Sequence, residues 1–126
     1  MKLILSGQRK QMLKNWENHI DGHKPVVKLF DPAGAATWLL TEMKPEDNDI
    51  AFGLCDLGFG FPELGYVSLS ELSRIRGGFG LGIERDKFFE AEHSLEVYAK
   101  AAHVHGGITF DPKALAQAKA ALEVSA

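Results

Sequence analysis

The stretch CDLGFGFPELGYVSLSEL, residues 55–72, decides the fold because it joins an apolar run to a capped helix. The overlapping run IAFGLCDLG (50–58) has the length and composition of a central strand. Downstream, Ser68 and Glu71 fit a capping box, which predicts a short helix over 69–76. Glycines between the two supply the positive φ of a tight turn. We therefore expect a direct strand-to-helix connection.

Upstream, the pattern predicts a helix followed by a β-hairpin. The helix begins at a capping Ser6 and ends at DG (21–22). PVVKLF (25–30) and ATWLLTEM (36–43) are typical of two strands, joined by the turn DPAG (31–34). Alternation in the second strand places Trp38 and Leu40 on one face of the sheet, and Leu39 and Thr41 on the other.

Downstream, one more strand and two helices are expected. Residues 83–89 predict an edge strand, because charged residues crowd it. Ser94 caps a helix that GG (106–107) closes, and DP (111–112) starts a last helix.

These elements predict an α+β fold, with a small, mainly antiparallel, meander-like sheet and three to four packed helices. The 126 residues are enough for one domain, which we expect to span 1–126. Within it, 1–105 form the core, and 106–126 form a C-terminal extension that carries the terminal helix. A hydrophobic content of 45% and a charged content of 25% exclude a disordered chain.

Cys55 is the single cysteine, so an intrachain disulfide, a Cys-pair zinc site and a CxxC redox motif are all excluded. The start, MKLILSGQRK, has too short an apolar run for a signal or membrane segment. We therefore expect a cytoplasmic protein that does not enter a membrane.

Charge is distributed unevenly along the chain. Residues 1–28 hold six Lys or Arg against two acidic residues, 29–72 hold one Lys against eight acidic residues, and 73–126 hold seven of each. The middle segment therefore carries −7, which either marks a binding face or is neutralised when the segments intermix on folding. A basic surface for nucleic acid is not indicated.

The glycines of the quoted stretch complete no nucleotide-binding motif. In the spacing that starts at Gly58, Glu63 occupies the third glycine position of a dinucleotide fingerprint. The spacing that starts at Gly60 lacks the Lys-Ser/Thr pair of a phosphate loop.

Among the histidines, His19 and His23 are four apart, but the helix breaks between them, so a shared face is not expected.

Three carboxylates near one turn allow two competing hypotheses, a metal site or a structural role. Asp56 and Glu63 flank one turn, and Glu42 lies near the end of a neighbouring predicted strand. If the three converge, they could bind Mg or Mn and support a nuclease or phosphodiesterase. In the other interpretation, Asp56 and Glu63 accept backbone N–H bonds that hold the loop closed, and Asp56 braces the loop from within.

Aromatic residues next to these acids favour a binding surface. Phe59, Phe61 and Tyr66 surround Glu63, in a stretch with no Lys or Arg for stacked nucleic acid. Exposed aromatics beside acidic side chains are typical of protein-binding hot spots. We therefore expect Phe59, Phe61, Glu63 and Tyr66 to contact a partner protein, with Asp56 supporting them and no catalytic residue.

Three stretches, PVVKLFDPAGAATWLLTE, AFGLCDLGFGFPELGYVSLSEL and GIERDKFFEAE, resemble an uncharacterised bacterial domain-of-unknown-function family, number 2958. The resemblance covers most of residues 3–99. It implies a small accessory protein encoded on conjugative plasmids, integrative elements or phages. It supplies no reaction, cofactor or catalytic residue. The resulting hypothesis is a non-enzymatic protein that binds a host or element-encoded protein, including as an anti-defence factor.

Overall fold

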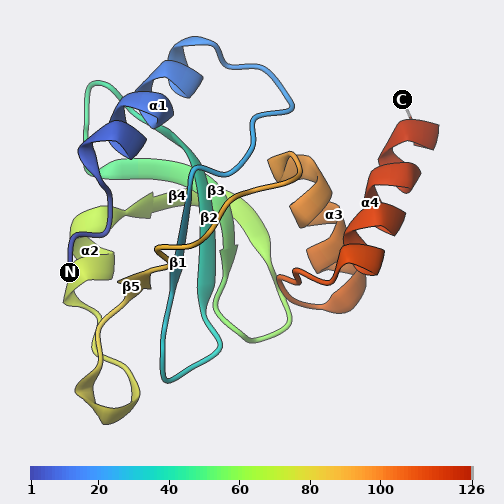
Figure 1. Ribbon diagram of the computed structural model, residues 1–126. Helices are drawn as coiled ribbons and strands as arrows, with labels where there is room; N and C mark the ends of the chain where they lie inside the picture. Colours follow the sequence, from blue (N-terminus) through green and yellow to red (C-terminus); the bar gives the residue numbers. More distant parts are fainter. Residues whose placement is uncertain (126) are drawn as a thin grey trace.

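A single antiparallel sheet organises the chain, and the computed structural model describes residues 1–125 (Figure 1). The strands lie in the order β4-β3-β2-β1-β5. Their bounds are β1 (Val27–Phe30), β2 (Thr37–Met43), β3 (Ile50–Asp56), β4 (Glu63–Ser68) and β5 (Glu84–Arg85). The described helices are α1 (Ser6–Glu17), α2 (Leu69–Arg74), α3 (Leu95–His105) and α4 (Pro112–Ser125), with a short 3-10 turn at Gly78–Gly80. The predicted α+β class and antiparallel meander are confirmed.

The stretch after β3 corrects the sequence prediction, because it forms a strand of its own. β4 pairs antiparallel with β3, with Tyr66 opposite Phe52 and Glu63 opposite Cys55. Gly58 and Gly60 do adopt positive φ, both +90°, but they turn the chain back into a hairpin. The expected strand-to-helix connection is therefore wrong. β4 is short and interrupted by Gly65, which weakens its strand signal.

Three predicted boundaries also shift. The expected strand over 83–89 shrinks to Glu84–Arg85, an edge strand beside β1. Helix α1 has Leu5 as its N-cap, and the side chain of Gln8 accepts a hydrogen bond from the Leu5 amide at 2.8 Å. The expected Ser6 cap is therefore wrong. α1 also ends at Glu17, well before the predicted stop.

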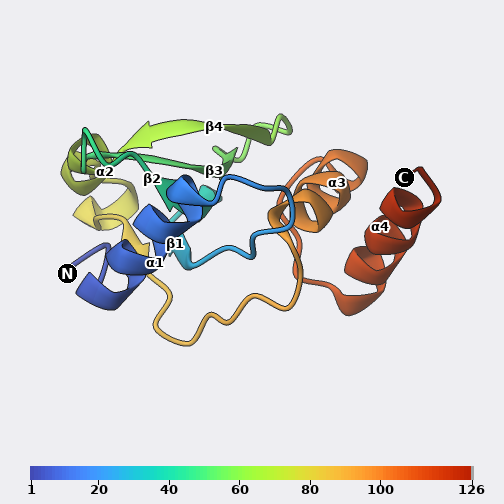
Figure 2. The same ribbon diagram turned by 90° about the horizontal axis from the view of Figure 1, so that it is seen from above.

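Each face of the sheet has its own hydrophobic cluster. Trp38 and Leu40 of β2 pack with α1 and α2 on one face. Leu39 and Leu54 pack with α3 and α4 on the other, where Leu115 anchors the last helix. Figures 1 and 2 show the two helix pairs on opposite sides of the sheet. Helix α4 of the predicted C-terminal extension is thus packed against α3.

A β-bulge interrupts the alternation in β2. Leu40 pairs with Gly53 and Glu42 pairs with Phe52, so Thr41 is an extra residue on β2. Here the two backbones approach so closely that a Cβ on Gly53 would lie 1.9 Å from the carbonyl oxygen of Leu39. The extra residue turns Glu42 onto the α3 face, whereas strict alternation would leave it on the face of Trp38.

No helix within residues 1–125 has both the length and the apolar character needed to cross a membrane.

Candidate functional site

The loop between β3 and β4, residues 57–62, holds two aromatic rings in solvent. Phe59 is 78% exposed and Phe61 is 79% exposed. Leu57, at the start of the same loop, is also exposed. The structure thus leaves both predicted phenylalanines available for contact.

Asp56 holds this loop from within, as the second sequence hypothesis proposed. The side chain is buried, and Oδ1 accepts a hydrogen bond from the Gly58 amide at 2.8 Å. Oδ2 accepts one from the amide of Ile108, also at 2.8 Å. Both carboxylate oxygens are therefore bound to backbone N–H groups, and the second bond ties the loop to the link between α3 and α4.

Two further loops lie at the same end of the sheet (Figure 1, lower edge). The turn at 31–36 touches the aromatic loop, since a Cβ on Gly58 would lie 2.7 Å from the Ala35 methyl. On its other side, a Cβ on Gly78 would lie 3.1 Å from the Ala33 methyl. Together, loops 31–36, 57–62 and 75–82 form what we call the loop end of the sheet.

The loop end contributes a third exposed ring, which sequence reasoning did not single out. Phe79 is 97% exposed and has φ +60°. A bulky side chain rarely adopts this left-handed conformation, which costs about 1–2 kcal/mol. The glycines around it were visible in the sequence, but nothing there showed that the ring points outward.

Glu63 and Tyr66 lie on β4, beyond the loop. The side chain of Glu63 is exposed and makes no hydrogen bond or ion pair within residues 1–125, so the backbone bonds predicted for this carboxylate are absent there. The Tyr66 ring lies 5.1 Å from the Phe52 ring, and Nζ of Lys44 lies 4.7 Å from the Tyr66 ring centre. Both residues are accessible, but Tyr66 stands about 10 Å along the strand from Glu63.

The three carboxylates do not converge, so the structure contradicts the alternative hypothesis of a metal site formed by Glu42, Asp56 and Glu63. Asp56 pairs with Thr37 at one end of β2, and Glu42 pairs with Phe52, four residues from Asp56 along β3. At the rise of a β-strand this separation is roughly 13 Å. Among residues 1–125, no group of three His, Cys, Asp or Glu side chains is placed to hold a metal ion.

Glu42 has a different partner. Its side chain is buried, and Nδ1 of His19 donates a hydrogen bond to Oε1 at 2.6 Å. Both side chains line a pocket of about 230 Å³ between the sheet, α3 and the segment after α1. Sequence reasoning missed this pair, because His19 lies beyond the end of α1, where helical spacing gives no guidance.

Comparison with known proteins adds a family. The model for a family described as "Protein of unknown function (DUF2958)" matches residues 3–109. The chain belongs to this family. No curated protein and no solved structure matches it.

The DUF2958 match includes every candidate residue above, together with Ile108. It ends before α4, whose first residue is Pro112. The family description gives no activity, so the chemistry of the side chains must carry any functional argument.

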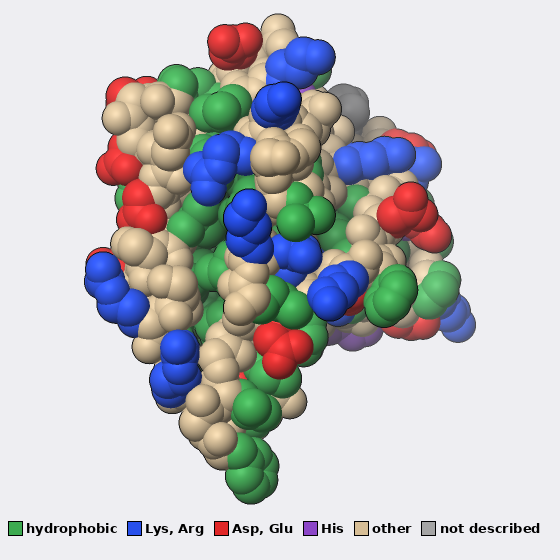
Figure 3. Space-filling view, turned by 60° about the vertical axis from the view of Figure 1, so that its left-hand side comes forward, with side chains coloured by type: hydrophobic (Ala, Val, Ile, Leu, Met, Phe, Trp, Pro, Cys, Tyr) green, Lys and Arg blue, Asp and Glu red, His purple; other side chains and the backbone are tan. Residues whose placement is uncertain are grey.

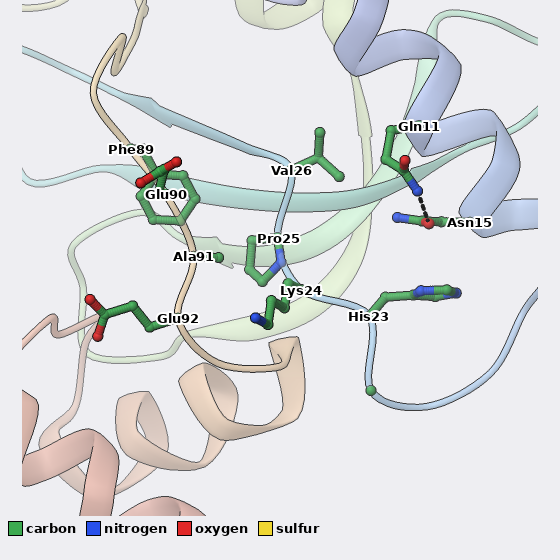
Figure 4. A pocket seen from close by; sticks show the side chains of 11 residues that line it. Gln11, Asn15, His23, Lys24, Pro25, Val26, Phe89, Glu90, Ala91 and Glu92 are labelled. Atoms are coloured by element: carbon green, nitrogen blue, oxygen red, sulfur yellow. Dashed lines mark hydrogen bonds between the residues drawn. The ribbon is translucent and has the colours of Figure 1, made fainter.

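A wide groove lies on another side of this DUF2958 chain (Figure 4). Its volume is about 850 Å³, between α1 and the extended segment 89–92. On the α1 side, Nε2 of Gln11 donates to Oδ1 of the buried Asn15 at 2.8 Å, and Nδ2 of Asn15 donates to the Thr41 carbonyl. These amides are already bound to each other and to the backbone.

Folding intermixes the charged segments of the sequence. His19 of the basic segment pairs with Glu42 of the acidic segment, Lys28 pairs with Asp86 of the balanced segment at 3.3 Å, and Glu42 and Asp56 are buried. Figure 3 shows Lys and Arg side chains along the middle of one face, with acidic side chains among and around them. The −7 of the middle segment therefore does not lie wholly on the surface.

Two groups near β4 have shifted pKa values. Burial, and then the charge of Glu63, raise the pKa of the Cys55 thiol to about 11, which keeps it protonated and unreactive at neutral pH. Hydrogen bonds from Ser68 and then Ser70 lower the pKa of Asp49 below 3.8. Asp49 thereby fixes the start of α2, where it also accepts a bond from the Ser70 amide at 2.7 Å.

Proposed function

We propose that this protein is a non-enzymatic binding module that recognises a partner protein through the loop end of the sheet. The observation that carries the proposal is the pair of rings at Phe59 and Phe61, held in water on a loop that buried Asp56 braces. A soluble chain gains no stability from rings in this position. Burying each of them against a partner would contribute about 1.5–3 kcal/mol.

The geometry of the loop end supports recognition because the rings are preorganised. Asp56 fixes the loop through two backbone bonds, so little conformational entropy is lost when a partner binds. Phe79 extends the apolar surface across the 31–36 turn. Glu63 adds an unpaired charge at the rim, where charges steer association.

We propose further that the module serves a bacterial mobile genetic element and acts on a host or element-encoded protein, including as an anti-defence factor. The family resemblance described above motivates this part. In such a role the protein works inside the cell, and its partner determines its effect.

Site-specific photo-crosslinking tests the proposal. A photoreactive phenylalanine analogue at position 59 or 61, expressed in a bacterial host that carries the element, should give a discrete adduct with one protein. The matched control is position 88, because Phe88 is 94% exposed but lies outside the loop end. The adduct should disappear when Phe79→Ser is added to the probe at position 59.

Two results would overturn the proposal. One is the absence of any adduct from positions 59 and 61. The other is the same set of adducts from position 88, which would indicate contact with random neighbours. Unchanged thermal unfolding of Phe59→Ser/Phe61→Ser would show that the rings have no role in folding.

A further inference from the structure

The pocket beside Glu42 and His19 has features of a binding site that the loop end does not share. Its volume is about 230 Å³, below the roughly 300–1,000 Å³ of sites for drug-sized molecules. It therefore has room for one side chain or a small ligand. Its walls combine apolar side chains, Phe52, Leu64 and Leu95, with carboxylates.

One carboxylate oxygen of Glu42 has no partner among residues 1–125. The residue is 3% exposed, and its single side-chain hydrogen bond to these residues joins Oε1 to His19. Among these residues, no side-chain oxygen is both fully buried and unbonded. Oε2 therefore keeps its residual access through the pocket that Glu42 lines. A nearly buried carboxylate with one unbonded oxygen is costly to maintain without a ligand.

The β-bulge places this carboxylate where it is. Thr41 adds the residue that turns Glu42 onto the pocket face, opposite Phe52. Bulges often re-aim a side chain in this way next to functional sites. The folded backbone thus directs an acidic group into an apolar pocket, which hydrophobic packing alone would not favour.

The charges around the pocket select the ligand. Glu42, Asp21 and Glu96 line it, and within residues 1–125 no Lys or Arg does. Glu96 is already engaged, since its Oε1 accepts a bond from the Gly22 amide at 3.0 Å. We propose that the pocket binds an alkylammonium group, with its nitrogen at Oε2 of Glu42 and its methylene chain against Phe52 and Leu64.

A lysine side chain has this chemistry, and so does a free aliphatic amine. Leu64 at the mouth of the pocket belongs to the same strand as Glu63 and Tyr66. A partner that covers β4 could therefore insert a lysine, and this source of the ammonium rests on the proposed function. The small-molecule measurement below does not, so the two proposals can fail separately.

The test is a titration of the full chain with n-butylammonium chloride at constant ionic strength, followed by the backbone amide resonances of Phe52, Leu64 and Glu96. We expect saturable shifts confined to the pocket, and weaker or no shifts with neutral 1-butanol. Glu42→Gln keeps an acceptor for His19 but removes the charge, and should weaken binding about tenfold or more. The matched control, Glu71→Gln at an exposed position of α2, should bind like wild type.

Two further measurements are needed. One distinguishes a protein lysine from a free amine as the source of the ammonium group, and the other uses a second variant in case Glu42→Gln does not fold. Tighter binding of Nα-acetyl-lysine methylamide than of 1,5-diaminopentane would support a protein lysine, and the reverse order a free amine. Leu64→Lys, at the exposed mouth, should abolish butylammonium binding in a folded chain, because its own ammonium reaches the pocket. The proposal is overturned if wild type shows no saturable shift, if 1-butanol binds equally well, or if Glu42→Gln binds unchanged.

Discussion

Asp56 and Glu42 are both buried acids on the α3 face, at opposite ends of the β2–β3 pair, yet the protein uses them differently. Both oxygens of Asp56 accept backbone N–H bonds. Glu42 has one side-chain oxygen bonded to His19 and one with no partner in the described part of the chain. The fold therefore satisfies both carboxylate oxygens of Asp56. The second oxygen of Glu42 would need a bound ligand to be satisfied. Hydrogen-bond satisfaction, rather than burial, separates a structural acid from a candidate binding acid.

The largest expected effect is the loss of Asp56. Asp56→Ala leaves the amides of Gly58 and Ile108 without their acceptor and should lower the free energy of unfolding by about 2 kcal/mol. Urea denaturation measures it. Glu63→Ala, an exposed acid close by, is the control and should change little. Equal effects of the two substitutions on the free energy of unfolding would contradict the role of Asp56 in stabilising the loop.

Removal of the Glu42 carboxylate, unlike that of Asp56, should not destabilise the fold. Glu42→Met fills similar space without a buried charge, so the free energy of unfolding should stay level or rise by about 1 kcal/mol. Thermal unfolding of wild type and variant side by side measures this. A loss of unfolding free energy as large as that of Asp56→Ala would show that Glu42, like Asp56, has a structural role.

Asp49 provides a pH-dependent intermediate case. Its folded pKa lies below the ordinary 3.8, so its stabilisation is fully present above pH 3.8 and is lost as the pH falls through the folded pKa. Asp49→Asn should therefore be less stable than wild type at pH 6, and the difference should shrink in acid. Urea midpoints at several pH values, with Glu46→Gln as control, test this. A difference independent of pH would contradict it.

The smallest effect on folding concerns Cys55. Its pKa is raised from 9.0 to about 11, so burial of the neutral thiol stabilises the fold below pH 9.0, and that contribution declines as the pH rises towards 11. At pH 8 the thiolate fraction should be about 100-fold lower in the native than in the unfolded chain. Iodoacetamide alkylation with and without urea measures it. Equal rates would show that the thiol is not protected.

The sequence was most informative where a single local signal decides an element. The β1–β2 hairpin, the Ser94 cap of α3 and the Gly106 stop are all present, and Gly106 has φ +78°. The two faces of β2 are also as predicted up to Leu40. These features depend on neighbouring residues, which one sequence displays directly.

The remainder depends on contacts between distant segments. Strand β4 needs β3 as its partner, and its own six residues carry little strand signal. The bulge at Thr41 exists only in the pairing of β2 with β3, so alternation along the sequence alone could not show which face Glu42 occupies. The His19–Glu42 bond joins residues 23 positions apart. For the site, the exposed rings and the Asp56 brace were predictable, but the pocket was not.

The bond from the Ile108 amide to Asp56 links the end of β3, where the 57–62 loop begins, to a residue 52 positions later in the chain. A partner that displaces the aromatic loop must stretch or break this tether, so the strain reaches the junction of α3 and α4. Hydrogen exchange of the Ile108 amide should therefore report on the loop. It should slow when a partner stabilises the loop in place and become faster when a partner displaces it. One backbone proton, remote from the rings themselves, can report whether that surface is occupied.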